Sequence, residues 1–429
     1  SDYLQALRIP CRSPYSAENL PPDADLIVIG KHAKLVPESN PEVRAAFGKP
    51  VRSFPEVLQE LTADTRNLVV AGSYGKSTCS ALAAWALLRS GRDPSYFVGA
   101  ITYDLPANSH LGSGSAFVLE GDEYPSANWD DRSKFLYYNP RSVLLISGTH
   151  DHVNVFPTVE EYLKPYRELV RLIPPEGLLV ACLDGEHVPE LLPLARAGVV
   201  TYSLDKPEAD WRAADITRGT RTDFRLLRRG EEVTRISSVL LGDHNVQNMV
   251  GAGALLLETG LLTPEELATA FREFRGVKRR LELKTPNARL PVYEDFGSSY
   301  AKAEAGIRSM RAQFPDRRLL VVFEPHTFSF RNRSALGWYD TLFREAARVF
   351  VYDPPSHGAA THDQLSQEEI VAAIRRSGTP AQPFHTWEQL RDTLGPELKD
   401  EDVVLMVTSG AMGGSIQALA DHVTAHFPA

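Results

Sequence analysis

The chain has 429 residues, of which 43% are apolar and 24% are charged, and its formal net charge at pH 7 is −9. This length predicts two or three domains, and the apolar fraction is typical of a globular protein. The acidic balance, without any block of like charge, argues against a nucleic-acid-binding protein, so no nucleic-acid partner is expected.

The chain contains no run of eighteen apolar residues and no basic-then-apolar leader. We therefore expect no membrane span or export signal and predict a cytoplasmic protein. Its three cysteines, Cys11, Cys79 and Cys182, are far apart and lack C-x-x-C spacing. This spacing argues against a disulfide framework or a structural zinc site and favours buried structural thiols.

The first 64 residues alternate between short strand and helix patterns. Strands are expected over residues 25–30 and 50–53, with helices over 40–46 and 55–61. This alternation predicts a small α/β unit, which looks like a domain entered partway through.

Residues 68–90 carry the strongest functional signal. A strand over 68–71 leads into the turn Gly72-Ser-Tyr-Gly-Lys-Ser-Thr78, and a helical pattern follows. Glycines and the unpaired N–H groups of a helix N-terminus suit phosphate binding, although the loop is shorter than the common P-loop and an ordinary turn is the alternative. We predict ATP as the ligand, bound by Gly72, Ser73, Gly75, Lys76, Ser77 and Thr78. Lys76 is expected at the β/γ-phosphates and Ser77 on Mg²⁺.

Acidic and histidine side chains follow two further predicted strands. Residues 115–120 end in Glu120-Gly-Asp-Glu-Tyr124, and residues 142–147 lead to His150, Asp151 and His152. Ligands of open parallel sheets bind at the carboxyl ends of strands, so these side chains are candidate metal ligands. The alternatives are a solvated loop and structural histidines.

The second half of the chain contains a predicted hairpin and a second α/β pattern. Alternation between residues 202 and 238, with Gly230 at the turn, predicts a small antiparallel sheet. Asn245 and Asn248 are expected in the first turn of the next helix, where they would read an adenine edge or act as N-caps. Parallel strands are predicted over 290–295, 318–323, 347–352 and 403–408.

Taken together, these motifs resemble those of the Mur ligase family over essentially the whole chain. This family comprises ATP-dependent enzymes that join an amino acid or peptide to a UDP-linked muramic acid. The matching segments are Gly72–Thr78, Glu120–Tyr124, Asp151–His152, Gly242–Asn248, Gly276–Glu282, Tyr293–Phe296 and Phe323–Ser329.

The resemblance implies an α/β protein with the three-domain Mur ligase architecture. Residues 1–64 would be part of a UDP-sugar-binding domain whose first β-α unit precedes Ser1, 65–276 a central P-loop domain, and 277–429 a Rossmann-like domain that binds the amine. The implied catalytic residues are Lys76, Glu120, His152 and Arg280, and the implied Mg²⁺ ligands are Ser77, Glu120 and His152. Further nucleotide contacts are implied for His244, Asn245, Asn248, Arg280 and Asp295.

Within the family, residues 131–135, 139–141 and 409–414 look most like the branch that recycles a tripeptide, L-alanyl-γ-D-glutamyl-meso-diaminopimelate. The expected partners are therefore UDP-N-acetylmuramate and a peptide or amino-acid amine, with ATP and Mg²⁺, in a monomer or weak homodimer. The expected substrate-binding residues are Arg132, Ser133, Lys134, His326 and Arg331. Solvated surface charge is the alternative for His326 and Arg331.

Two departures from the family pattern leave other interpretations open. Ser298, Ser299 and Tyr300 stand where the family has two histidines and a proline, and Ser147 stands where it has an asparagine. The alternatives are a ligase acting on folate or a polypeptide, a nucleotide-binding protein that has lost ligation, and a simple P-loop ATPase.

Overall fold

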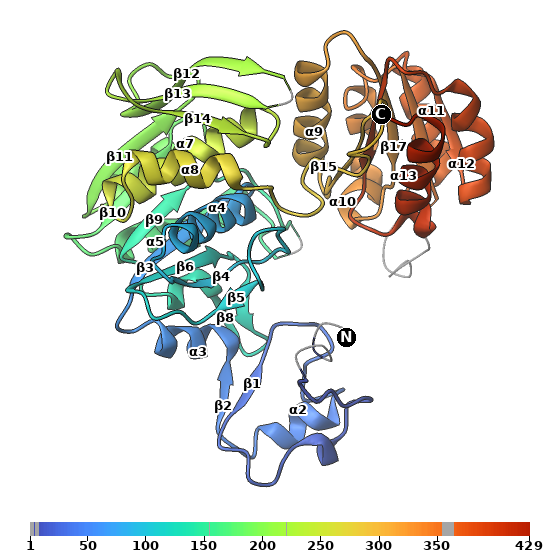
Figure 1. The fold of residues 1–429 in the computed structure, drawn as a ribbon. Helices are drawn as coiled ribbons and strands as arrows, with labels where there is room; N and C mark the ends of the chain where they lie inside the picture. Colours follow the sequence, from blue (N-terminus) through green and yellow to red (C-terminus); the bar gives the residue numbers. More distant parts are fainter. Residues whose placement is uncertain (1–3, 5–7, 154, 220, 354–363) are drawn as a thin grey trace. The chain divides into compact units, whose positions relative to one another are not determined.

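The structure is a computed structural model that describes residues 4, 8–153, 155–219, 221–353 and 364–429. Figure 1 shows the fold, which divides into two compact units. The first unit comprises residues 1–99, 108–211 and 251–262, and the second comprises residues 100–107, 212–250 and 263–429. The domain boundaries inferred from the sequence, 1–64, 65–276 and 277–429, stay a prediction.

The first unit begins with a two-stranded parallel sheet of β1 (Ile27–Ile29) and β2 (Val51–Ser53). The neighbouring helices are η1 (Ala17–Asn19), α2 (Pro41–Ala46) and α3 (Phe54–Leu61). The Asn40 side chain caps α2, and a capping box between Ser53 and Glu56 starts α3. These local signals confirm the predicted strand–helix alternation.

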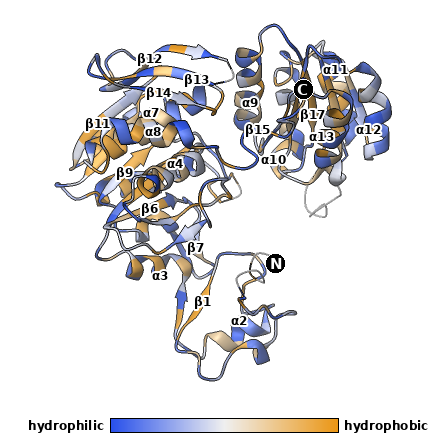
Figure 2. Ribbon diagram, in the orientation of Figure 1, coloured by the Kyte–Doolittle hydropathy of each residue, from blue (hydrophilic) through white to orange (hydrophobic). Residues whose placement is uncertain are grey.

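The main sheet of the first unit has the strand order β11-β10-β9-β3-β6-β4-β5, and its neighbours run parallel except at the edge strand β5. The strand bounds are Arg66–Ala71 (β3), Ser95–Phe97 (β4), Ser109–His110 (β5), Ala116–Gly121 (β6), Ser142–Leu145 (β9), Leu178–Cys182 (β10) and Gly198–Ser203 (β11). The inner strands are buried, and Figure 2 shows by colour that β6 and β9 are largely hydrophobic. This burial on both faces is expected of a parallel sheet covered by helices.

The remaining elements of the first unit connect these strands. They are the helices α4 (Lys76–Arg89), η2 (Lys134–Tyr137), α5 (Val159–Leu172), α6 (Val188–Leu191) and η3 (Leu192–Leu194), and the antiparallel pair β7 (Pro125–Ala127) and β8 (Asp130–Ser133). Helix α4 ends at Arg89, with Ser90 as its C-cap residue, and Gly91 follows at φ +73°, a left-handed conformation that glycine adopts readily after a helix.

Three strands, β12 (Trp211–Arg218), β13 (Thr222–Arg228) and β14 (Glu231–Ser238), lie near the start of the second unit. The first residue of β12, Trp211, still belongs to the first unit. Strands β13 and β14 form the predicted antiparallel hairpin, with Gly230 at φ +87° in the turn. Helix α7 (Asp243–Glu258) starts in the second unit and ends in the first, and α8 (Pro264–Glu273) follows.

A second sheet has the order β15-β16-β20-β17-β18-β19 and is parallel except for β15. Its strands are Glu282–Leu283 (β15), Val292–Asp295 (β16), Arg318–Phe323 (β17), Arg348–Tyr352 (β18), Ala381–Phe384 (β19) and Asp402–Val407 (β20). The sequence predicted β16, β17, β18 and β20 and missed β19.

Helices cover both faces of this sheet. They are α9 (Tyr300–Gln313), α10 (Phe328–Arg331), η4 (Arg333–Asp340), α11 (Gln367–Arg376), α12 (Trp387–Leu394), η6 (Gly395–Glu397), η7 (Met412–Gly414) and α13 (Ser415–His426). Successive residues of β17 alternate between two cores, because side chains of a strand point to opposite faces. Val321 packs with residues of α9 and α11, whereas Val322 packs with residues of α12 and α13.

The cysteine prediction was right for two residues and wrong for one. Cys79 and Cys182 are buried thiols inside the first unit, but Cys11 is exposed. Cys11 lies in an N-terminal stretch without regular secondary structure, where no sheet or helix face covers it. Among the described residues, no helix is both long and apolar enough to cross a membrane.

Candidate functional site

The turn between β3 and α4 has the backbone of an anion-binding loop. Gly75 adopts a left-handed conformation at φ +78° and starts α4 without a side-chain cap, so the first N–H groups of the helix face no capping oxygen. Gly72 adopts φ +145°, and a Cβ added there would lie 2.9 Å from the backbone nitrogen of Ser147. Glycine is therefore required where the loop packs against the end of β9.

Lys76 forms the central ion pair of this site. Its Nζ lies 2.9 Å from Oε2 of Glu123 and 2.6 Å from the carbonyl oxygen of Gly72. The Glu123 side chain is completely buried, and 15% of the Lys76 side chain is exposed. Burial lowers the pKa of Lys76, but the charge and hydrogen bond of Glu123, together with the charges of Asp122 and Glu120, outweigh burial and raise the pKa above its usual value. Burial likewise raises the pKa of Glu123, and Lys76 together with His152 holds it well below its usual range. Both groups are therefore charged at neutral pH.

Glu120 lies at the end of β6 and contacts the other predicted metal ligand of the loop. Its Oε1 accepts a hydrogen bond from Ser77 Oγ at 2.8 Å, and its Oε2 accepts one from the Gly99 backbone N–H at 2.6 Å. A hydroxyl and a carboxylate are oxygen ligands that suit Mg²⁺, which usually keeps several of its own waters. The two side chains therefore fit the predicted ion. Among the described residues, no group of three or more His, Cys, Asp and Glu side chains gathers as a metal site.

His152 contacts Glu123, whereas the sequence prediction paired it with Glu120. Its Nε2 lies 3.3 Å from Oε1 of Glu123, and its ring packs edge-on against Tyr124 with the centroids 4.5 Å apart. The backbone of His152 has φ +55°, an uncommon conformation for histidine that turns the chain at this point. His152 thus lies beside the ion pair of Lys76 and Glu123, and its role as a metal ligand stays a prediction.

The three predicted substrate residues of the first unit lie near the same acidic run. The guanidinium of Arg132 lies 4.7 Å from the ring centroid of Tyr137, and Ser133 is buried. Lys134 Nζ is 2.6 Å from Oδ2 of Asp122, one residue from Glu123. The structure therefore places Lys134 beside the acidic run, and binding of substrate by these residues stays a prediction.

The predicted adenine residues lie in the second unit, at the start of α7. His244 Nδ1 is 3.1 Å from Ser309 Oγ, and burial lowers the pKa of His244 to about 4. Asn245 Nδ2 donates to the Leu241 carbonyl at 2.8 Å, and Asn248 Nδ2 donates to Asn245 Oδ1 at 3.3 Å. Asn245 lies in the first turn of α7, as predicted, whereas Asn248 lies in the second turn, and both side chains are buried.

Arg280 and Asp295 also belong to the second unit and lie close together. The guanidinium of Arg280 lies 4.8 Å from the Phe296 ring centroid, and its Nη1 donates to the Phe296 carbonyl at 3.1 Å. Asp295 accepts a hydrogen bond from the Leu281 backbone N–H at 3.1 Å. Burial raises the pKa of Asp295, and the charge of Arg280 partly opposes that shift. Their predicted contacts with nucleotide stay predictions.

His326 and Arg331 follow β17 in the same unit. His326 Nδ1 is 3.5 Å from Oε1 of the buried Glu324, and about a third of the His326 side chain, 34%, is exposed. Arg331 is the last residue of α10. The exposure of His326 is compatible with contact to a substrate, which stays a prediction.

Comparison with known proteins identifies the family. Residues 70–256 match the family model for the Mur ligase middle domain, and residues 279–410 match the one described as Mur ligase, glutamate ligase domain. The UDP-N-acetylmuramate–L-alanine ligase of Geobacter sp. (strain M21) is 30% identical over 403 residues, which are 92% of this chain and 84% of that protein. The chain belongs to the Mur ligase family. Like other Mur ligases, it is an ATP-dependent ligase that forms an amide bond.

Relatives of this Mur ligase include enzymes with different amine substrates. The UDP-N-acetylmuramate–L-alanyl-gamma-D-glutamyl-meso-2,6-diaminoheptandioate ligase of Escherichia coli (strain K12) is 28% identical over 95% of this chain and 86% of its own length. The crystal structure of UDP-N-acetylmuramate–alanine ligase from Thermotoga maritima has the same fold, with a TM-score of 0.77 and 22% identity over 99% of this chain and 90% of that one. The predicted family and fold class are confirmed.

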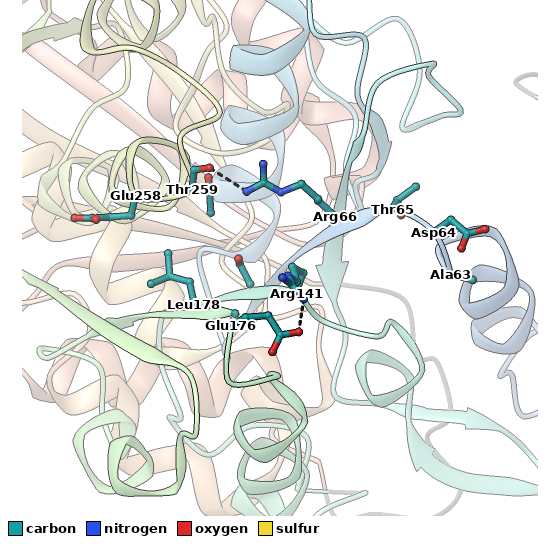
Figure 3. A pocket seen from close by; sticks show the side chains of 11 residues that line it. Ala63, Asp64, Thr65, Arg66, Arg141, Glu176, Leu178, Glu258 and Thr259 are labelled. Carbon is teal, nitrogen blue, oxygen red and sulfur yellow. Dashed lines mark hydrogen bonds and ion pairs between the residues drawn. The ribbon is translucent and has the colours of Figure 1, made fainter.

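A pocket of the first unit lies apart from the residues discussed above. It has a volume of about 640 Å³ and opens at the amino ends of β3, β9 and β10, where Arg66, Ser142 and Leu178 line it. Figure 3 shows two basic side chains of its lining, with Arg66 bonded to the Thr259 carbonyl at 2.9 Å and Arg141 to Glu176 at 2.6 Å. The Lys76 loop follows the carboxyl end of β3, so this pocket contains none of the predicted site residues.

Three residues that organise the candidate site were not predicted from the sequence. Glu123 lies within the acidic run Glu120–Tyr124, but only Glu120 of that run was expected in the site. Tyr162 and Tyr166 of α5 are fully buried, and the hydroxyl of Tyr162 contacts both Ser73 and Glu123. Two tyrosines four residues apart on one helix face were the available signal, because a buried phenol requires a hydrogen-bond partner.

Proposed function

We propose that this Mur ligase joins the carboxylate of UDP-N-acetylmuramate to the amine of L-alanyl-γ-D-glutamyl-meso-diaminopimelate. A recycling ligase of this type works with ATP and Mg²⁺ in the cytoplasm. The arrangement of Lys76, Ser77 and Glu120 around the β3–α4 loop carries the phosphoryl-transfer part of the proposal. The Escherichia coli relative that is named for the tripeptide supports the substrate.

L-alanine is the second candidate for the amine. The relative from Geobacter and the solved structure from Thermotoga maritima are both named for ligation of L-alanine. The two candidates share the same reaction, since both substrates present the α-amine of an L-alanine residue. They differ in the extra length and negative charge that the amine-binding residues must accept.

The reaction needs activation because a carboxylate is anionic and has no good leaving group. The γ-phosphoryl group of ATP passes to the carboxylate and gives an acyl phosphate and ADP, and the amine then displaces phosphate. Lys76 would neutralise charge on the transferred group, and the Gly72–Thr78 backbone would hold the phosphates. Ser77 would hold one Mg²⁺, and Glu120 with His152 would hold a second; these ions would supply further neutralisation of phosphate charge when bound.

The residues of the second unit complete the proposal. Asn245 and Asn248 would contact adenine, and Arg280 and Asp295 the phosphates or ribose. His326 and Arg331, with Arg132 and Lys134 of the first unit, would bind the acidic parts of the substrates. We propose the domain assignment 1–64, 65–276 and 277–429 for binding of the UDP-sugar, ATP and the amine.

The test measures ADP release with Mg²⁺-ATP and UDP-N-acetylmuramate in three arms, with no amine, with L-alanine and with the tripeptide. Mass spectrometry identifies the product. Tripeptide-dependent ADP together with a product of ligated mass supports the proposal, whereas turnover with L-alanine alone assigns the second candidate. ADP release that is independent of any amine would contradict both.

A pair of variants tests the loop itself. Lys76→Ala is expected to abolish ADP formation because the lysine acts on the transferred group, while Lys164→Ala removes an exposed lysine of α5 and is expected to leave it unchanged. Near wild-type turnover of Lys76→Ala would refute the phosphate-loop assignment. ATP binding without turnover with any amine would instead direct attention to Ser298, Ser299 and Tyr300.

A further inference from the structure

Tyr162 connects the nucleotide loop with the carboxylate that holds Lys76. Its hydroxyl lies 2.9 Å from Ser73 Oγ, 3.3 Å from Glu123 Oε1 and 3.1 Å from the Tyr166 hydroxyl. Tyr162 and Tyr166 are both fully buried on α5, and burial raises the pKa of both phenols. Each hydroxyl therefore keeps one proton to donate at neutral pH.

The hydrogen bonds of Ser73 determine where the Tyr162 proton points. Ser73 Oγ donates to the Thr149 carbonyl at 2.5 Å, so it accepts the proton of Tyr162. Because Tyr162 has a single proton, it cannot donate fully to Ser73 and Glu123 at the same time. The Tyr162 hydroxyl lies 2.9 Å from Ser73 Oγ and 3.3 Å from Glu123 Oε1, so Tyr162 donates mainly to Ser73 in this state.

Glu123 does not need the Tyr162 proton while Lys76 is present. Its Oε2 lies 2.9 Å from the Lys76 ammonium, and its Oε1 lies 3.3 Å from His152 Nε2. The requirement changes if Lys76 turns toward the phosphates of a bound nucleotide. The completely buried Glu123 then loses the lysine ammonium on Oε2 and keeps only the contacts of Oε1, and a buried carboxylate that loses a charged partner needs another hydrogen-bond donor in its place.

We propose that Tyr162 is a positioning residue that releases Lys76 for the nucleotide by donating its proton to Glu123 in exchange. Rotation about the phenolic C–O bond redirects the proton from Ser73 to Glu123, and no covalent bond changes. The Tyr166 hydroxyl, 3.1 Å away, is placed to donate to Tyr162 in turn. This role rests on the proposed contact of Lys76 with the phosphates.

Tyr162→Phe tests the proposal with Tyr166→Phe as a matched control. Both changes keep a buried ring on α5, but of these two tyrosines it is Tyr162 whose hydroxyl contacts Ser73 and Glu123, whereas the Tyr166 hydroxyl contacts Tyr162. Calorimetry with ATP in the absence of divalent ions is expected to show that Tyr162→Phe binds ATP about tenfold more weakly than the unaltered chain. A tenfold change in affinity corresponds to the free energy of about one hydrogen bond to a charged group. Tyr166→Phe is expected to stay within about twofold of the unaltered chain, since its hydroxyl contacts Tyr162 rather than Glu123.

Kinetics and a double variant separate exchange of the proton from simple packing. Tyr162→Phe should raise KM for ATP and leave kcat at saturating ATP almost unchanged. In a Glu123→Gln background the buried charge is gone, so adding Tyr162→Phe should no longer weaken ATP binding. Unchanged affinity of Tyr162→Phe, or an equal loss in both backgrounds, would overturn the proposal. If Lys76→Ala binds ATP as tightly as the unaltered chain, the proposed contact between Lys76 and the phosphates is wrong, and this result does not depend on Tyr162.

Discussion

Replacing Lys76 with methionine removes the cation from a buried ion pair while keeping much of the side-chain volume. At 2.9 Å and an effective dielectric constant of about 20, the attraction between Lys76 and Glu123 is about 6 kcal/mol before desolvation. Removing one member of a buried pair usually costs about 3–5 kcal/mol, because the other charge stays buried. His152 and Tyr162 still contact Glu123, so we expect a loss of about 3 kcal/mol for Lys76→Met.

Urea unfolding at pH 7, followed together with hydrogen exchange in β3 and α4, measures this loss in the first unit. Lys134→Met is the matched control, because its pair with Asp122 is more exposed, at 23% and 37% of the two side chains. It should cost less than about 1 kcal/mol. The double variant Lys76→Met/Glu123→Gln should lose less stability than the sum of the two single variants. Equal losses in Lys76→Met and Lys134→Met, or strict additivity in the double variant, would refute the reasoning.

Three further outcomes are expected. His152→Ala should raise the Mg²⁺ concentration for half-maximal ADP formation about tenfold, and an unchanged Mg²⁺ titration would make this histidine structural. Burial lowers the pKa of His244 from an ordinary 6.5 to about 4, so as the pH falls the unfolded chain takes up a proton at this histidine before the folded chain does. The free energy of unfolding should therefore be highest above pH 6.5 and should decrease as the pH drops toward 4. Urea titrations over this pH range should show that the free energy of unfolding decreases by at most about 3 kcal/mol, and this decrease should be absent from His244→Gln. An equal decrease in His244→Gln would exclude His244 as its source. Gly251→Ala places a Cβ 2.6 Å from the Tyr202 ring and should cost about 1–3 kcal/mol, and a melting temperature equal to that of the unaltered chain would contradict this clash.

Strands and the nucleotide loop were predictable from the sequence because their signals are local. Apolar runs such as residues 319–323 are buried on both faces, and Gly72 and Gly75 of the β3–α4 turn have positive φ angles that glycine adopts readily. Strand β19 was missed because Ala381–Phe384 is short, polar in part and contains Pro383. Proline is tolerated there because β19 is the edge strand of its sheet.

The choice of Glu123 over Glu120 as the partner of Lys76 was not predictable in the same way. Glu120 is the second-last residue of β6 and Glu123 lies two residues beyond the strand, so strand periodicity does not indicate which of the two turns inward. The environment of Glu123 also depends on later segments of the chain, because His152 and Tyr162 of α5 both contact this carboxylate. Such contacts between segments far apart in the chain have no local signal.

The ion pair between Lys76 and Glu123 also affects which anions can bind at the loop, because an anion that binds Lys76 must displace Glu123. A phosphate group that approaches the loop meets a lysine whose charge is already neutralised by a carboxylate 2.9 Å away. A small ion such as sulfate or inorganic phosphate offers a single anionic centre to displace that carboxylate, whereas a nucleotide triphosphate adds contacts along its whole chain to the helix N-terminus. We therefore expect Glu123 to weaken the binding of single anions at this loop more than the binding of a nucleotide triphosphate.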